Sequence, residues 1–222
     1  MPKLCVALDL DREEAYRLIE SLSGYPLVFK IGPKLFLEAG REVIEVVKGY
    51  GREVFLDMKF HDIPNTVKLA VEEAEKLGVD YLTLHTLGGR EMLESAVSAR
   101  RKTNLLGVTI LTSQGEEYLD FIKTRFPSVK ELALYLADIA KDVGLDGVVC
   151  SAQEVYEIKR RTGLLTVVPG IRVSGDYGDQ KRVFTPNKAV SEGADIIVMG
   201  RDIYRSADPG KVVERVLESL GE

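Results

Sequence analysis

The strongest constraint on the fold is an alternation of short apolar segments and amphipathic segments along the whole chain. The short segments are rich in Val, Ile and Leu, and stretches with helical spacing of apolar residues follow them. The pattern predicts eight β-strands, at Leu4–Asp9, Leu27–Gly32, Glu53–Lys59, Tyr81–Thr86, Leu105–Thr112, Gly147–Ser151, Leu164–Gly170 and Asp195–Gly200. Strands this uniformly apolar are typical of a parallel sheet with no face exposed to water.

The segments between these strands predict helices in regular succession. Examples are Arg12–Leu22, Lys34–Tyr50, Asn65–Gly78 and Ser151–Gly163, and several end near the glycine that helix C-termini favour. Eight βα units of about 28 residues each favour a closed (β/α)8 TIM barrel, with an open doubly wound sheet as the alternative. No linker interrupts the pattern, so we expect a single domain over residues 1–222.

Composition is consistent with one globular domain that has a substantial core. The chain has 222 residues, 45% hydrophobic and 29% charged, and its net charge of -5 argues against a general nucleic-acid or acidic-membrane binder. We find no apolar run of the roughly 18 residues that span a membrane, and the opening MPKLCVALDL does not resemble a signal peptide. Cys5 and Cys150 fall in predicted strands, so we expect two buried thiols and a reducing cytoplasm.

The stretch FLDMKFHDIP, residues 55–64, places Asp57, Lys59 and Asp62 where the third predicted strand ends. Charged groups are costly to bury unless they are paired or functional. Because strand side chains alternate, Asp57 and Lys59 should project together into the barrel mouth, where TIM barrels have their active sites. Each would keep the other charged, which leaves Lys59 as an ammonium that can act as an acid. A purely structural ion pair is the alternative, but further polar residues are predicted at the same rim: Asp9, Lys30, Thr112, Ser113 and Arg201.

Two loops near the end of the chain indicate a site for a phosphate group. Residues 167–186, VVPGIRVSGDYGDQKRVFTP, leave the seventh strand in a long polar loop of the kind that covers a ligand as a lid. The segment DIIVMGRDIYRSADP ends the eighth strand in glycine and Arg201. Loops after strands seven and eight are the usual phosphate site of this fold, which predicts a substrate with a phosphomonoester. The alternative is that Arg201 only caps the barrel rim.

Taken together, the motifs resemble orotidine 5'-phosphate decarboxylase over the full length of the chain. They are VALD at the start, FKIG around Lys30, DMKFHDIPNTV around the charged cluster, LTS after the fifth strand, PGIR and GDQKR in the lid, and GADIIVMGRDI at the end. The pattern D-x-K-x-x-D-I-P-x-T is highly specific when it ends a third barrel strand. The resemblance implies the decarboxylation of orotidine 5'-monophosphate to uridine 5'-monophosphate, the last step of de novo pyrimidine nucleotide synthesis.

The resemblance also implies roles for individual residues. Lys59 would stabilise and protonate the C6 carbanion within a charged chain of Lys30, Asp57, Lys59 and Asp62, and no metal, flavin or other cofactor would be needed. The chain would form a homodimer in which each site is completed by the partner subunit through three residues: Asp62, Ile63 and Thr66. The remaining substrate contacts would come from Asp9 and Lys30 on the ribose, Thr112 on the pyrimidine, Pro169, the lid residues Gln180 and Arg182, and Gly200 with Arg201 on the phosphate.

Two other functions compete with this one. A magnesium-dependent sugar-phosphate enzyme of the same superfamily shares the acid–lysine–acid motif, but Lys30, the HDIPNT continuation and the GDQ lid favour a nucleotide substrate. A catalytically silent barrel that binds a phosphorylated ligand would be expected to have a broken charge chain, whereas here it is unbroken. The two histidines have ordinary interpretations, His85 as a hydrogen-bonded barrel residue and His61 as a loop residue.

Overall fold

The eight predicted strands are all present, and they close into a parallel barrel in the computed structural model, which describes residues 1–173 and 184–221. Each strand pairs with the next along the chain, and the barrel closes between the first and the last strand. The strands are β1 (Lys3–Ala7), β2 (Val28–Ile31), β3 (Glu53–Phe60), β4 (Tyr81–His85), β5 (Asn104–Val108), β6 (Gly147–Val149), β7 (Leu165–Val168) and β8 (Ile196–Met199). The closed TIM barrel is therefore confirmed, and the open sheet is excluded.

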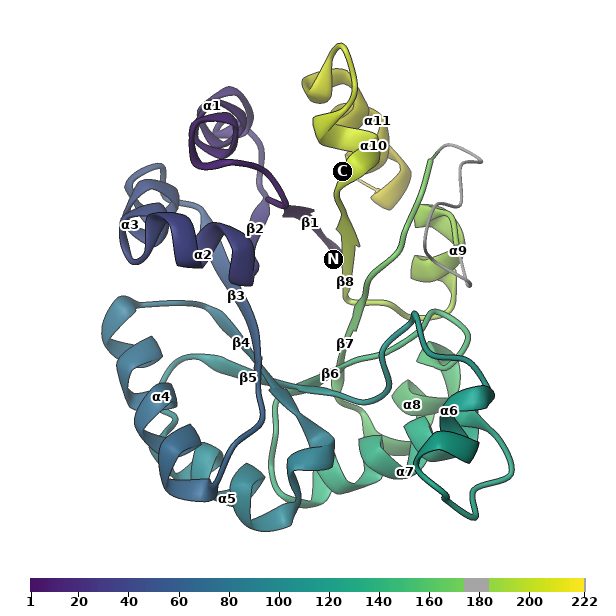
Figure 1. The fold of residues 1–222 in the computed structure, drawn as a ribbon. Coiled ribbons are helices and arrows are strands. Elements are labelled where there is room, and N and C mark those ends of the chain that lie inside the picture. Colours follow the sequence, from purple (N-terminus) through teal and green to yellow (C-terminus); the bar gives the residue numbers. More distant parts are fainter. Residues whose placement is uncertain (174–183, 222) are drawn as a thin grey trace.

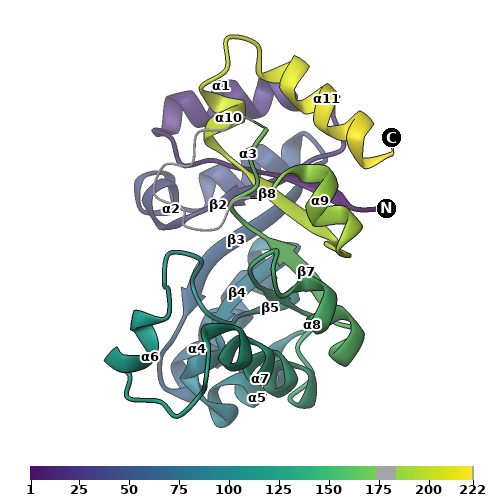
Figure 2. The same cartoon turned by 90° about the vertical axis from the view of Figure 1, so that its right-hand side faces the viewer.

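Helices surround the strands on the outside of the barrel (Figures 1 and 2). They are α1 (Arg12–Leu22), α2 (Pro33–Ala39), α3 (Glu42–Gly49), α4 (Pro64–Leu77), η1 (Thr86–Gly88), α5 (Arg90–Ala99), α6 (Glu117–Phe121), α7 (Val129–Asp142), α8 (Val155–Thr162), α9 (Pro186–Ser191), α10 (Arg201–Tyr204) and α11 (Pro209–Leu220). Most of their apolar faces pack against outward-facing strand residues in one large hydrophobic cluster, and α6 with part of α7 forms a smaller one. Among the described residues, none of these helices combines the length and the apolar character needed to cross a bilayer.

Three sequence-based boundaries were wrong, and one of them is the start of the helix expected from Ser151, which begins only at Val155. The single helix expected over 34–50 is two helices, because Gly40 takes φ +58° after α2 and the chain turns before α3 begins. The fifth strand was expected to continue to Thr112 but ends at Val108, which is opposite His85, the last residue of β4. Thr109 still donates its backbone N–H to the carbonyl of Val149 at 3.2 Å, but β6 also ends at Val149, so strand propensity does not carry β5 further.

The barrel interior changes in character from one end to the other. Its middle is filled by side chains that include Cys5, Val28, Phe55 and Val167. Both cysteines are buried free thiols, as expected.

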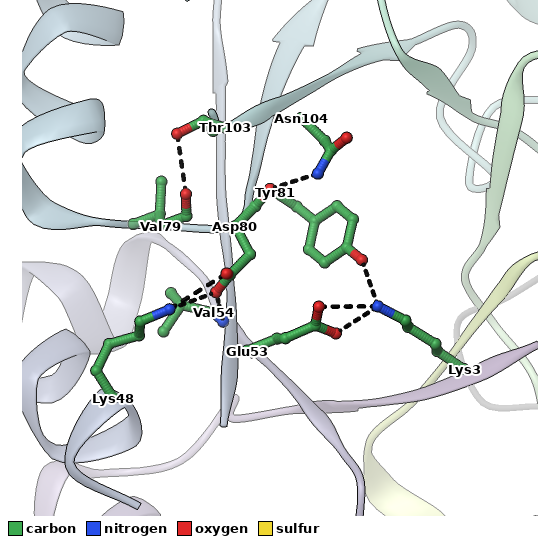
Figure 3. A network of polar contacts seen from close by, with 9 residues as sticks. All are labelled: Lys3, Lys48, Glu53, Val54, Val79, Asp80, Tyr81, Thr103 and Asn104. Carbon is green, nitrogen blue, oxygen red and sulfur yellow. Dashed lines mark hydrogen bonds and ion pairs between the residues drawn. The ribbon is translucent and has the colours of Figure 1, made fainter. Parts of the chain in front are cut away.

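At the N-terminal ends of the strands, Lys3 bridges to Glu53 at 2.7 Å and donates to the hydroxyl of Tyr81 at 3.0 Å (Figure 3). This network lies at the N-terminal end of the barrel. The cavity described below opens at the other end, where the strands have their C-termini.

Candidate active site

β3 carries the acid and the lysine at the centre of the site. The ammonium of Lys59 donates to both carboxylate oxygens of Asp57, at 2.8 and 2.9 Å. The prediction that these side chains project together is confirmed, but the backbone is not regular between them. The pairing of β3 with β4 shifts register between Leu56 and Phe60, and Lys59 has φ +49°, a left-handed conformation that a residue with a Cβ rarely adopts.

Two further strands extend the pair into a line of alternating charges. Lys30 from β2 places its ammonium 3.4 Å from Asp57 and 3.7 Å from Asp9, which follows the end of β1. Lys30 and Asp57 are largely buried, with side chains 14% and 11% exposed, whereas Asp9 faces solvent. Three of the four members expected in the charged chain, Lys30, Asp57 and Lys59, are therefore in contact within one subunit, and Asp9 joins them.

The electrostatics of this line keep its buried members charged. Burial alone lowers the pKa of the Lys30 ammonium, but the carboxylates of Asp57 and Asp9 outweigh it, so the pKa lies above its ordinary value. Burial likewise raises the pKa of the Asp57 carboxyl. The ammonium groups of Lys30 and Lys59 and the hydrogen bonds from Lys59 and Thr83 more than compensate, so this pKa lies below its ordinary value. At neutral pH the site thus presents a fixed carboxylate between two cations.

Thr83 contacts this cluster and was not identified from the sequence. Its hydroxyl, on β4, donates to Asp57 at 2.9 Å and accepts the backbone N–H of Lys59 at 2.8 Å. The period-two alternation of β4 puts Thr83 on the same face as Tyr81 and His85, which is the signal that could have indicated it. A threonine in a strand is otherwise too common to attract attention.

A cavity of about 490 Å³ opens at the C-terminal ends of the strands, beside the charged line. Eight of the predicted site residues line it: Asp9, Lys30, Asp57, Lys59, Thr112, Pro169, Gly200 and Arg201. The volume lies within the range of small-molecule sites in proteins. The charged line and the predicted phosphate residues therefore share one cavity.

The side of the cavity that contains Arg201 is built by the loops after β7 and β8. Gly200 ends the loop after β8, and Arg201 is the first residue of α10. Arg172, which also lines the cavity, is buried and donates to Asp202 at 3.1 Å, and the same carboxylate accepts the N–H of Val173 at 2.7 Å. This buried ion pair fixes the loop after β7 to the residue next to Arg201. The sequence showed Arg172 in the lid motif without indicating its partner.

The structure does not bring every predicted residue to this cavity. Within the part of the chain that is described, Asp62, Ile63 and Thr66 are exposed and lie outside the cavity lining. One oxygen of Asp62 accepts the N–H of its own neighbour, Ile63, at 2.7 Å. Gln180 and Arg182 lie outside the described residues.

The two histidines stack at the edge of the site, with ring centroids 5.5 Å apart. Burial lowers the pKa of His85, and the nearby His61 and Lys59 lower it further. Nδ1 of His85 accepts the N–H of Leu87 at 3.4 Å, consistent with the hydrogen-bonded barrel residue expected from the sequence. His61 is exposed after the end of β3.

Comparison with known proteins gives one consistent result. Residues 2–216 match the model of the orotidine 5'-phosphate decarboxylase / HUMPS family. The orotidine 5'-phosphate decarboxylase of Aquifex aeolicus is 46% identical over the full length of both chains. The solved structure of that enzyme from Lactobacillus acidophilus superposes over both whole chains with a TM-score of 0.88 at 34% identity. A structure from Methanocaldococcus jannaschii, complexed with the inhibitor BMP, covers both chains with a TM-score of 0.81 at 26% identity. The chain therefore belongs to the orotidine 5'-phosphate decarboxylase family.

Proposed function

We propose that this chain converts orotidine 5'-monophosphate to uridine 5'-monophosphate without a cofactor, and that Lys59 stabilises and then protonates the C6 carbanion. The decarboxylation belongs to pyrimidine nucleotide synthesis and is the activity of the family. The observation that supports the role of Lys59 most directly is its position: a side chain that lines the cavity, with its ammonium held on both oxygens of a buried carboxylate.

The chemistry of the reaction explains why a fixed ammonium is useful. The bond between C6 and the carboxylate breaks, carbon dioxide leaves, and the electron pair remains in an sp² orbital on C6 that the ring delocalises poorly. A cation already in place stabilises that charge without reorganisation of the site. A proton from the Lys59 ammonium then forms the C6–H bond, and the resulting amine regains a proton from solvent.

The neighbours of Lys59 keep it charged and oriented. The Asp57 carboxylate is the direct partner, and Lys30, 3.4 Å from Asp57, offsets the cost of burying that negative charge. The aspartate therefore stays ionised although its side chain is largely buried. A fixed geometry of this kind lets Lys59 meet the reacting carbon in the required orientation.

The rest of the cavity provides contacts for the nucleotide. We assign Asp9 and Lys30 to the ribose hydroxyls, Thr112 and Pro169 to the pyrimidine, and Gly200 with Arg201 to the phosphate. Gln180 and Arg182 remain proposed lid contacts. The assignments are supported by the shared lining of one cavity, in which Arg201 and the charged line are both present.

Replacing Arg201 with alanine should weaken binding of uridine 5'-monophosphate by about 2–4 kcal/mol, because a guanidinium that grips a phosphate makes charge-assisted bonds. Calorimetric titration of the variant with this nucleotide, and with uridine as the ligand without phosphate, measures the effect. Arg205→Ala is the matched control, because Arg205 is exposed and outside the cavity lining. An equal loss of affinity for both ligands would show that Arg201 does not bind the phosphate.

Turnover should not depend on a divalent cation. Purified protein mixed with orotidine 5'-monophosphate in excess chelator should lose the ultraviolet absorbance of the substrate at the same rate as without chelator. A rate that falls in chelator and returns with magnesium would favour the sugar-phosphate enzyme. An open-chain sugar phosphate tested in parallel, with magnesium, should give no product.

We also propose that the functional unit is a homodimer, in which Asp62, Ile63 and Thr66 complete the site of the partner subunit. Their exposure outside the cavity of their own chain supports this arrangement, as does the 66% exposure of the apolar Ile63.

A further inference from the structure

We propose that Thr83 is a positioning residue for the decarboxylation, whose single hydroxyl fixes both the Asp57 carboxylate and the backbone of Lys59. This inference rests on the proposed role of Lys59 as cation and proton donor.

The hydrogen bonds of the Thr83 hydroxyl have only one possible direction. The backbone N–H of Lys59 can only donate, and an ionised Asp57 can only accept. The hydroxyl oxygen therefore accepts from Lys59 at 2.8 Å, and its one hydrogen goes to Asp57 at 2.9 Å. Thr83 is fully buried, with 0% of its surface exposed, so water does not compete for either bond.

The backbone of β3 shows why Lys59 needs this partner. β3 and β4 pair at Leu56 with Leu82 and again at Phe60 with Leu84. Asp57, Met58 and Lys59 thus lie opposite Thr83 alone, and the regular ladder is interrupted there. Lys59 also has φ +49°, which is strained for a residue with a Cβ. A strained conformation persists where its surroundings hold it, and the bond from the Lys59 N–H to Thr83 is such a restraint.

The same hydroxyl also acts on the other end of the lysine. Asp57 holds the Lys59 ammonium through both carboxylate oxygens, and Thr83 holds Asp57. One buried oxygen atom on the neighbouring strand therefore holds the backbone of Lys59 directly and its ammonium group through Asp57. Removing that oxygen should loosen both ends of Lys59 and leave the distant phosphate contacts unchanged.

The test compares Thr83→Val, which keeps the shape but loses the hydroxyl, with Thr83→Ser, which keeps the hydroxyl. We expect Thr83→Val to lower kcat about 10- to 100-fold, the range that follows from losing the partner of buried polar groups, while KM changes by less than about 3-fold. Thr83→Ser should stay within about 3-fold of the native kcat. The Thr83 bond helps to hold the pKa of Asp57 below its ordinary value, so this pKa should rise in Thr83→Val. As the pH is lowered, the variant should therefore lose activity at a higher pH than the native protein does.

Thr103→Val is the matched control. Thr103, the residue before β5, is also a buried threonine, and its hydroxyl donates to the carbonyl of Val79 at 2.9 Å, at the opposite end of the barrel (Figure 3). This variant should lose thermal stability to a similar extent as Thr83→Val while keeping the native kcat and pH profile. Should Thr83→Val fail to fold, Thr83→Cys replaces it, since a thiol is nearly the same size but a poor hydrogen-bonding group.

The outcomes separate this inference from the proposed function. A native kcat in folded Thr83→Val, a change confined to KM, or an equally slow Thr83→Ser would each overturn the role of Thr83. The proposed role of Lys59 would survive those results as long as Lys59→Ala is inactive. Turnover retained by Lys59→Ala would instead refute the proposed role of Lys59 as cation and proton donor, on which the inference depends.

Discussion

Lys59→Ala is expected to lower kcat by at least about 10⁴-fold while the protein still binds uridine 5'-monophosphate, because the substitution removes both the stabilising cation and the proton donor. The proposed phosphate contacts, Gly200 and Arg201, lie at the start of α10 and should persist. Asp57 keeps Lys30 as a partner at 3.4 Å, so its carboxylate is not left unpaired in the variant. Decarboxylation is followed by ultraviolet absorbance, and nucleotide binding by calorimetry.

Lys34→Ala is the control for this loss. Lys34 is an exposed lysine that forms a 2.5 Å ion pair with Asp11 and is outside the cavity lining, so its removal should leave turnover unchanged. Turnover near the native rate in folded Lys59→Ala would show that another group protonates C6. Loss of both turnover and nucleotide binding would indicate damage to the whole site, and a role for Lys59 in the chemistry would then lack support.

The barrel could be predicted from the sequence because its signals are local and repeated. Each strand is buried on both faces, so its apolar residues are continuous, and each helix has its own periodicity. The wrong boundaries have causes that depend on other parts of the chain or on backbone geometry. β5 ends where its neighbour β4 ends, and the helix expected over 34–50 is divided by the positive φ of Gly40.

The sequence predicted those parts of the site that consist of single charged residues near the ends of strands. Asp57, Lys59 and Lys30 are of this kind, and the family resemblance added the substrate contacts that we propose. Thr83 was missed because its role depends on a register shift between two strands, which is not encoded in any short stretch. The pairing of Arg172 with Asp202 is likewise set by contact between the loop after β7 and helix α10, and the two residues are 30 positions apart in sequence.

Asp62 raises a different question, because it follows Lys59 by three residues yet is exposed and lies outside the cavity lining of its own chain. If each site combines Lys59 of one subunit with Asp62 of the other, the monomer is incomplete and the dimer is required for activity. Lys59→Ala and Asp62→Ala homodimers would each contain two damaged sites. A mixed dimer would contain one site with both substitutions and one with neither.

Activity should therefore return when the two inactive variants exchange subunits. With random 1:1 exchange, half of the dimers are mixed and half of their sites are intact, so about a quarter of the native activity is expected. The variants are dissociated and reassociated, exchange is verified with a tag on one of them, and turnover is measured. Lys59→Ala mixed with Lys30→Ala is the control, because both residues belong to the same subunit's site and every mixed site stays damaged. Verified exchange without recovery would mean that Asp62 acts within its own chain, whereas recovery in the control pair as well would mean that the two lysines do not share a site.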